Sequence, residues 1–530
     1  MTAADQRSPA VHGQRNGDDA QTKKTVGIGV NQGMTQLDQS NIDALRSLQI
    51  PKGCNIIDGT FEPAATGREL EVTSPIDGAV LGSIPDSDHT DVDKAVDAAR
   101  HSFESGVWSG LAPVMRKKVL LKWAELIEAN ALEIAVLGAR DNGTDIRMAL
   151  KGEPVSAAAT IRFYAEATDK VNGEITPTRP DVLSLIRKEP VGVVGVIIPW
   201  NFPLMIGAWK VAPALAAGNS VVLKPSEEAT FSTLRIAELA HEAGLPPGVL
   251  NVVTGRGSVV GEALGLHMDV DVLAFTGSGH VGRKLMEYSG RSNLKRIYLE
   301  LGGKSPNIVF ADAPDLEDTA AQTAASIFRN NGQVCVAASR LMVERPVYDD
   351  FMKLVRGHAE ALSVGDPLRL ENNTGALANS AQLTKTTAAV QLALEQGAVL
   401  STGGAVLHHE SGGFYHQPTI LTDVTRDMDV VQNEVFGPVL AARAFDTEEE
   451  AVQMANETVF GLSSAVWTSN LSKAHRMAGR IKSGQVHVNC FSGSDVTSPL
   501  SGVRQSGNGA DKSLHALEKY ENLKATWIQI

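Results

Sequence analysis

Apolar and polar positions follow two regular blocks along the chain, and each block has the pattern of an α/β domain. In the first block, residues 191–310, short apolar runs predict strands at 191–198, 220–223, 250–253, 272–275 and 297–301. Stretches of helical periodicity separate these runs at 205–217, 232–243 and 259–266. Strands that alternate with helices predict a parallel sheet with right-handed crossovers, which is a common scaffold for a dinucleotide.

The second block covers about 306–502 and predicts strands at 307–309, 340–343, 398–401, 439–445, 465–468 and 485–488. Before the first block, residues 55–84 have the pattern of short strands, with turns at Asp58-Gly59 and Asp77-Gly78. Residues 90–171 have the periodicity of helices. The predicted fold class is therefore α/β, and the length of 530 residues calls for more than one domain.

Residues 1–40 are polar and lack periodic apolar positions, so we expect a disordered N-terminal arm without a signal peptide. The net charge of −13 disfavours nucleic acids and anionic membrane surfaces as partners. No apolar run reaches the roughly 20 residues that span a bilayer. Three cysteines, Cys54, Cys335 and Cys490, indicate a reducing compartment and exclude a cysteine-rich zinc site. We therefore expect a cytoplasmic protein with no metal site.

Two motifs at strand ends are candidates for nucleotide binding. The segment 275–282, FTGSGHVG, links a predicted strand to a predicted helix. Its glycines let the backbone approach a phosphate, and a helix N-terminus attracts negative charge. A tight turn without a ligand explains this motif equally well. Lys224 and Glu227 end another strand, where their side chains can hydrogen-bond a ribose, and a solvated ion pair is the alternative.

Two further motifs are candidates for covalent chemistry. Glu300 follows an apolar strand and precedes two glycines, and a partly buried carboxylate there is a stronger base. A strand-end acid that points to water is the alternative. Cys335 follows the polar turn Asn330-Asn331-Gly332-Gln333, a setting that favours a reactive thiol over inert packing. Cys54 and Cys490 lack such a setting. No histidine is linked to Cys335 by spacing, which disfavours a protease-like pair.

Taken together, six motifs in one order resemble the aldehyde dehydrogenase superfamily. They are PWNFP at 199–203, KPSE at 224–227, FTGSGHVG at 275–282, LELGGK at 299–304, GQVC at 332–335 and NEVFGP at 433–438. The resemblance covers roughly residues 55–530. It implies an α/β fold with a Rossmann-type cofactor domain, an α/β catalytic domain and a small β oligomerisation region.

The resemblance implies a role for each matching residue. Cys335 is expected to form a thiohemiacetal, with Asn201 and the Cys335 backbone N–H as the oxyanion hole. Glu300 is expected to activate the water that hydrolyses the thioester, which replaces a ribose-binding role because Glu227 fills that position. The cofactor-binding residues implied are Ile197, Pro199, Trp200, Lys224, Ser226, Glu227, Gly257, Phe275, Thr276, Gly277, Ser278, Val281, Leu301, Gly302, Glu434 and Phe436.

The expected cofactor is NAD, with NADP possible, because a carboxylate at Glu227 repels a 2′-phosphate. The expected domains are 41–170 with 191–302 for the cofactor, 303–502 for catalysis, and 171–190 with 518–530 for oligomerisation. The extended segments 182–191 and 526–530 fit the last of these, so a homodimer or homotetramer is expected.

The C-terminal motifs QSGNG at 505–509, KSLHALEKY at 512–520 and LKATWI at 523–528 resemble one subfamily more closely. It oxidises ω-amino aldehydes from polyamine and arginine breakdown, such as γ-glutamyl-γ-aminobutyraldehyde and 4-guanidinobutyraldehyde. Three positions depart from the pattern: Leu500 and Ser501 stand where Phe and Gly are usual, and Ala510 replaces an Arg. The first two bear on the substrate tunnel and the third on a subunit contact.

Three residues are candidates for substrate binding. Asp495 lies in a loop that the resemblance places near the tunnel, where a carboxylate can pair with an amino or guanidino group. A solvated loop acid is the alternative. Trp209 and Phe491 are candidates for the tunnel wall, although Trp209 fits helix packing as well. The alternative functions are a general aliphatic aldehyde dehydrogenase, a catalytically silent cofactor-binding structural protein and a thiol-dependent acyl transferase.

Overall fold

The first lobe of the molecule is built on an eight-stranded sheet with the order β2-β1-β9-β8-β7-β10-β11-β21. The structure, a computed structural model, describes residues 36–491 and 495–530. The strands are β1 (Asn55–Ile57), β2 (Thr60–Glu62), β7 (Val193–Ile197), β8 (Ser220–Lys224), β9 (Leu250–Val252), β10 (Val272–Thr276), β11 (Arg296–Glu300) and β21 (Gly507–Asn508). Strands β7 to β11 are parallel, which confirms the predicted sheet.

Helices cover both faces of this sheet, so its central strands are buried at every position. One face is covered by α3 (Pro113–Ala129), α6 (Ser156–Ala167), α7 (Pro203–Ala217) and α8 (Phe231–Glu242). The other face is covered by α2 (His89–Glu104), α9 (Glu262–Leu266) and α10 (Gly279–Arg291). Helix α4 (Ala131–Asn142) packs on α8 and is followed by α5 (Ile146–Leu150).

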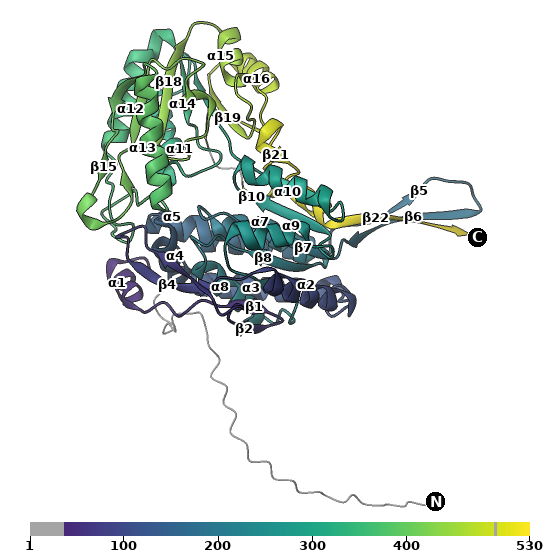
Figure 1. The fold of residues 1–530 in the computed structure, drawn as a ribbon. Coiled ribbons are helices and arrows are strands. Elements are labelled where there is room, and N and C mark those ends of the chain that lie inside the picture. The colour runs from purple at the N-terminus through teal and green to yellow at the C-terminus, as the bar shows by residue number, and fades with distance from the viewer. Residues whose placement is uncertain (1–35, 492–494) are drawn as a thin grey trace, which may run out of the picture.

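The second lobe, green in Figure 1, contains a seven-stranded sheet with the order β14-β17-β18-β13-β12-β19-β20. Its strands are β12 (Pro306–Val309), β13 (Arg340–Glu344), β14 (Val399–Thr402), β17 (Thr419–Thr422), β18 (Val439–Phe445), β19 (Ser463–Trp467) and β20 (Gln485–Val488). The six predicted strands are all present, and β17 was not predicted. Helices α11 (Leu316–Phe328) and α12 (Tyr348–Glu360) cover one face, α15 (Glu448–Asn456) and α16 (Leu471–Arg480) the other, and α13 (Ser380–Glu395) and α14 (Asp429–Gln432) the β14 side.

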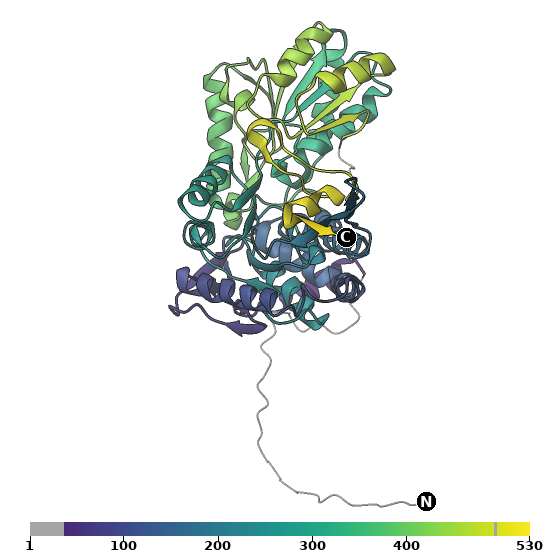
Figure 2. The ribbon, with the colours of Figure 1, turned by 90° about the vertical axis from the view of Figure 1, so that its right-hand side faces the viewer.

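Three smaller sheets complete the fold. Two are hairpins, β3 (Glu69–Thr73) with β4 (Val80–Pro85), and β15 (Val406–Leu407) with β16 (Tyr415–His416). The third, with the order β22-β6-β5, projects from the body in Figure 1 and points toward the viewer in Figure 2. It consists of β5 (Glu174–Thr176), β6 (Val182–Pro190) and β22 (Glu521–Gln529). Strand β22 begins five residues before the predicted strand, and β6 is the central strand rather than an edge.

The chain between the second lobe and this projecting sheet returns to the first lobe. Strand β21 pairs antiparallel with β11, and the 3₁₀-helix η7 (Leu514–Tyr520) places Ala516 and Leu517 in the first core. Residues 503–517, which the predicted domains left unassigned, therefore lie against the cofactor side of the molecule. No helix in the described ranges has the length and apolar character to cross a membrane.

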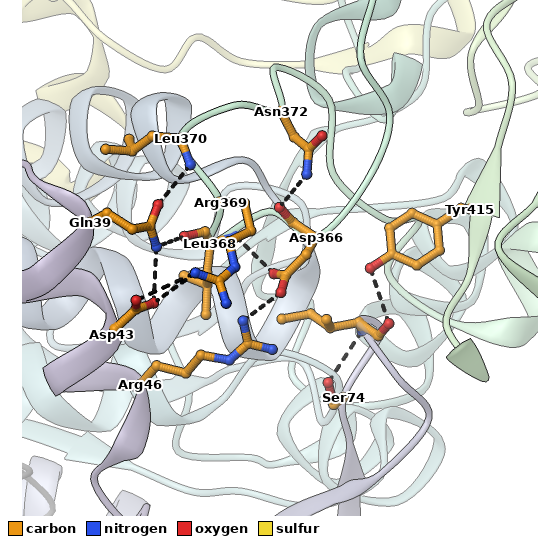
Figure 3. Close-up of polar contacts among 11 residues, drawn as sticks. Gln39, Asp43, Arg46, Ser74, Asp366, Leu368, Arg369, Leu370, Asn372 and Tyr415 are labelled. Carbon is orange, nitrogen blue, oxygen red and sulfur yellow. Dashed lines mark hydrogen bonds and ion pairs between the residues drawn. The ribbon is translucent and has the colours of Figure 1, made fainter. Parts of the chain in front are cut away.

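Helix α1 (Gln39–Ser47) connects the two lobes (Figure 3). Gln39 donates a hydrogen bond to the carbonyl oxygen of Leu368 at 2.9 Å and accepts one from the backbone N–H of Leu370 at 3.0 Å. Arg46 forms an ion pair with Asp366. The helix begins at Gln39, which corrects the end of the predicted disordered arm, because these tertiary contacts order a polar segment. Residues 1–35 of the arm lie outside the described residues.

Candidate active site

Cys335 follows a turn that local hydrogen bonds and tertiary contacts hold in place. Asn330, Asn331 and Gly332 have φ of 49°, 53° and 68°, so three consecutive residues are in the left-handed region. A Cβ at Gly332 would lie 2.0 Å from the carbonyl oxygen of Gly437, so no larger residue fits there. The Asn330 side chain accepts a hydrogen bond from Thr144 at 2.9 Å. Strain of this kind is typical of a functional site and presents the thiol in one orientation.

Asn201 lies in the turn between β7 and α7 and faces the same region. Its Nδ2 donates a hydrogen bond to the carbonyl oxygen of Gln333 at 2.8 Å, and the side chain is buried. An amide nitrogen carries two hydrogens, so one remains to stabilise a developing oxyanion. Asn201 and Cys335 both line one cavity, which fits the predicted oxyanion hole.

Glu300 ends β11 as a buried carboxylate among charged neighbours. Neither of its carboxylate oxygens has a hydrogen-bond partner among the described residues. Burial, followed by the negative charge of Asp511, raises the pKa of Glu300 well above its ordinary value. The charges of Lys210 and Lys519 oppose this rise. A carboxyl group with a raised pKa is a competent general base near neutral pH.

The Cys335 thiol needs a base to ionise, because its surroundings favour the protonated form. Burial, and then the charges of Glu434 and Glu300, raises the pKa of Cys335 to about 12. Since the thiolate is the nucleophile, the site has to remove this proton before attack. The two other cysteines stand apart: Cys54 is partly buried, and Cys490 is exposed.

A cavity of about 240 Å³ between the lobes collects nine of the residues predicted to bind the cofactor, together with the predicted oxyanion-hole residue Asn201. They are Pro199, Trp200, Asn201, Thr276, Gly277, Ser278, Leu301, Gly302, Glu434 and Phe436. Gln382 and Lys385 also line it and were not predicted. Ser278 caps α10 by accepting a hydrogen bond from Val281 N at 3.3 Å, and Trp200 packs edge-on against Phe436 with ring centroids 5.4 Å apart.

The remaining predicted cofactor residues lie at or just after the ends of neighbouring strands, except Val281 on helix α10. Lys224 donates a hydrogen bond to Glu227 at 2.8 Å, and Glu227 accepts another from Gly257 N at 3.1 Å. Burial alone would raise the pKa of Glu227, but the charge and hydrogen bond of Lys224, together with backbone hydrogen bonds, outweigh it and the pKa is lowered. Two other predicted residues, Ile197 and Phe275, are buried on β7 and β10, Ser226 is buried beside Glu227, and Val281 is exposed on α10. These residues fit a dinucleotide, since Gly257 leaves space beside an ionised ribose acceptor.

A second cavity of about 390 Å³ lies on the other side of Cys335. Cys335 and Ile206 line both cavities, so the thiol stands between them. Trp209 and Phe491 line the second cavity, as does Leu500, one of the positions that depart from the family pattern. Asp495 does not line it: this side chain is exposed and accepts a hydrogen bond from Thr497 N at 2.8 Å. Residues 492–494 of its loop lie outside the described ranges.

Several residues of the site escaped sequence reasoning. Lys210 is a lysine inside an otherwise apolar helix, which is a signal for a buried charge. Asp511 follows the departure at Ala510 and carries no such signal. Arg329 directly precedes the cysteine turn and lines the second cavity. Its position next to the Cys335 motif was the only sequence signal for a role in the site.

Comparisons with known proteins agree with this geometry. The model of the aldehyde dehydrogenase family matches residues 61–526. The NADP/NAD-dependent aldehyde dehydrogenase PuuC of Escherichia coli (strain K12) is 47% identical over 475 residues, which cover 89% of this chain and 95% of that protein. The structure of γ-glutamyl-γ-aminobutyraldehyde dehydrogenase from Burkholderia cenocepacia J2315 is 46% identical, with a TM-score of 0.91 over 93% of this chain and 100% of that one.

An indole-3-acetaldehyde dehydrogenase solved with NAD⁺ is 47% identical, with a TM-score of 0.92 over 93% of this chain and 100% of that one. The family, the fold class and the nicotinamide cofactor expected from the sequence are thereby confirmed. The chain belongs to the aldehyde dehydrogenase family and is an NAD(P)-dependent aldehyde dehydrogenase.

Proposed function

We propose that this enzyme oxidises amino-substituted aldehydes of the kind formed in polyamine and arginine breakdown, with Cys335 as the nucleophile. The observation that carries the mechanism is the position of Cys335 between two cavities, one for each reactant. The substrate class is supported by the C-terminal motifs and by the activities for which two similar proteins are named. One is the γ-glutamyl-γ-aminobutyraldehyde dehydrogenase above, and another is an aminoacetaldehyde dehydrogenase of Pseudomonas aeruginosa, 40% identical over 483 residues.

In the first half-reaction, a base accepts the Cys335 proton and Sγ attacks the aldehyde carbon. Glu300 is a suitable base, because it is an unpartnered carboxylate whose charge acts on Cys335. The resulting oxyanion accepts hydrogen bonds from Asn201 Nδ2 and the Cys335 backbone N–H. NAD(P), when bound, supplies the hydride acceptor for the oxidation.

The second half-reaction hydrolyses the thioester on Cys335. Glu300 first releases the Cys335 proton to solvent and then accepts a proton from water as the water oxygen attacks the acyl carbon. The carbon–sulfur bond breaks, the carboxylic acid leaves, and Glu300 returns its proton to the departing thiolate. Asp511, Lys210 and Lys519 act through Glu300 by setting its charge state, so they are positioning residues. Glu227 favours NAD over NADP, because its ionised carboxylate repels a 2′-phosphate.

The assembly we infer is a homodimer or homotetramer in the cytoplasm. Strand β22 is an edge of the projecting sheet, and Leu523, Trp527 and Ile528 are exposed on it. An exposed edge with apolar side chains is suited to pair with a second copy. The sparse cysteines, none in a disulfide among the described residues, fit a reducing compartment.

The test is NADH formation with purified wild type and Cys335→Ala on a panel of aldehydes. The panel contains γ-glutamyl-γ-aminobutyraldehyde, 3-aminopropanal, 4-guanidinobutyraldehyde and simple alkanals. We expect Cys335→Ala to lower kcat/KM by about a thousandfold or more. Cys54→Ala and Cys490→Ala are the matched controls and should resemble wild type. Equal or higher kcat/KM for alkanals would make this a general aldehyde dehydrogenase, and NADH formation that survives Cys335→Ala would refute the nucleophile.

A further inference from the structure

The cavity of about 390 Å³ that ends at Cys335 carries an excess of positive charge. Lys151, Arg329 and Lys512 line it, whereas none of the described lining residues is an Asp or a Glu. His487 also lines it, and burial lowers the pKa of that imidazole, which favours its neutral form. Such a wall attracts anions and opposes a free ammonium or guanidinium group. Among the amino-substituted aldehydes it therefore favours one whose terminal amine is acylated and that carries a carboxylate, such as γ-glutamyl-γ-aminobutyraldehyde.

Arg329 is the cation in this wall that lies partly buried with no acidic partner among the described residues. Its Nε is buried without a hydrogen-bond partner, and among the described residues no Asp or Glu acts on the pKa of its guanidinium. Burial lowers the pKa of Arg329, and Cys335 is the group whose charge raises it. Arg329 is only partly exposed, so its guanidinium is incompletely hydrated, and an anionic ligand pairs with it more strongly there than with an arginine in open water.

The other two cations differ from Arg329 in their surroundings. Lys512 is buried, with Nζ 5.7 Å from the centroid of the Trp209 ring, and the charge of Asp495 acts on it. Lys151 is exposed. Both add positive potential to the cavity, but Arg329 is the one that offers a planar, bidentate donor set next to the nucleophile.

We propose that Arg329 binds a carboxylate carried by the substrate, so that the enzyme also oxidises short aldehydes with a terminal carboxylate, the ω-oxo acids. Because Arg329 and Cys335 line one cavity of about 390 Å³, the carboxylate lies a short chain away from the aldehyde carbon. The aldehyde carbon loses a hydride to NAD(P)⁺ and gains an oxygen from water, and the products are a dicarboxylate, NAD(P)H and protons. This proposal shares one assumption with the proposed function, namely that the aldehyde reaches Cys335 through this cavity.

The experiment compares three aldehydes of one chain length: an ω-oxo acid, its terminal carboxamide and the corresponding ω-aminoalkanal. It is repeated over a series of chain lengths. We expect wild type to prefer the acid to the carboxamide in kcat/KM by about tenfold to a hundredfold, as a charge-assisted hydrogen-bond pair does. Arg329→Gln should bring this ratio close to one, and Arg329→Lys should keep part of it. Arg345→Gln is the matched control, because Arg345 is exposed in the same lobe and pairs with Asp446, and it should keep the wild-type ratio.

A second readout does not depend on turnover. The dicarboxylate product and its monoamide are compared for their ability to slow alkylation of Cys335 by iodoacetamide. Stronger protection by the dicarboxylate in wild type, lost in Arg329→Gln, supports the anion site even if no aldehyde on the panel is oxidised. The proposal fails if acid and carboxamide are equivalent in wild type. It also fails if Arg329→Gln lowers kcat/KM for all three aldehydes by one factor, since Arg329 would then act on the thiol or on the fold.

Discussion

The carboxylate of Asp511 lies 2.6 Å from the ammonium group of Lys210, and both side chains are buried. Lys519 pairs with the same carboxylate. Burial alone would raise the pKa of Asp511, but the two lysines outweigh it and hold the pKa below its ordinary value. Asp511 is therefore ionised near Glu300. Together, the charges of Asp511, Lys210 and Lys519 set the pKa of Glu300, the proposed general base.

This arrangement predicts opposite effects of two substitutions on the pH dependence of thioester hydrolysis. Hydrolysis requires unprotonated Glu300, so its rate rises with pH through the pKa of that group. Asp511→Asn removes a charge that raises this pKa and should move the rising limb to lower pH. Lys210→Gln removes a charge that lowers it and should move the limb to higher pH. Single-turnover decay of the acyl-enzyme measures both, and shifts in the same direction would contradict the account.

Asn201→Ala should lower kcat by about 10²–10³, the cost of one oxyanion donor, with a smaller change in KM. The reason is that the Asn201 amide is buried beside the thiol, with one hydrogen not used by Gln333. Steady-state kinetics with a preferred aldehyde checks this. Alkylation of Cys335 by iodoacetamide forms no oxyanion, so its rate should remain near that of wild type. A large fall in alkylation would show instead that Asn201 serves mainly to hold the cysteine turn.

Glu227→Gln should reduce the preference for NAD over NADP by about tenfold or more, because it removes the charge that repels a 2′-phosphate. Initial rates with each cofactor at saturating aldehyde give the ratio of kcat/KM. Glu228→Gln is the neighbouring control and should leave the ratio unchanged. Among the described residues, the hydrogen bonds to Lys224 and Gly257 are made by Glu227 and not by Glu228. An unaltered ratio in Glu227→Gln would place cofactor discrimination elsewhere.

Gly332→Ala should destabilise the protein by about 2 kcal/mol or more, through its left-handed backbone and the contact with Gly437. It should also slow alkylation of Cys335, because the turn that presents the thiol is displaced. Gly357→Ala makes a suitable comparison: a Cβ there meets nothing within 4 Å on helix α12, and helix propensity predicts a gain of about 0.5–1 kcal/mol. Thermal unfolding of the two variants should move Tm in opposite directions.

A paired substitution on the projecting sheet, Leu523→Glu with Trp527→Glu, should shift the protein toward monomers. Both side chains are exposed on strand β22, and charges there oppose pairing with another copy. Sedimentation velocity over a range of concentrations measures the distribution. Glu substitutions at Leu471 and Met268, which are exposed elsewhere, control for surface charge. A wild-type protein that sediments as a monomer at all concentrations would exclude the inferred assembly.

Much of the fold was predictable because its signals are local. Strands β7 to β11 are apolar runs, since both faces of their sheet are covered, and the intervening helices have a clear period. The short strands β17 and β21 escaped, because pairing with β18 and β11 defines them rather than their own sequence. Helix α1 escaped partly for a similar reason: contacts with the loop around Asp366 and Leu368 order its polar start.

The sequence by itself determined the family and the identity of the chemical groups, since Cys335, Glu300 and Asn201 lie in short motifs whose order is readable without coordinates. Only the tertiary structure decided how those groups are tuned and what surrounds them. It brings Asp511 to Lys210 across 301 positions of the chain, places Arg329 unpaired in the cavity wall and leaves Asp495 outside it. The physical reason is that charge, burial and pKa depend on distances between segments that are remote in sequence, and no local pattern encodes those distances.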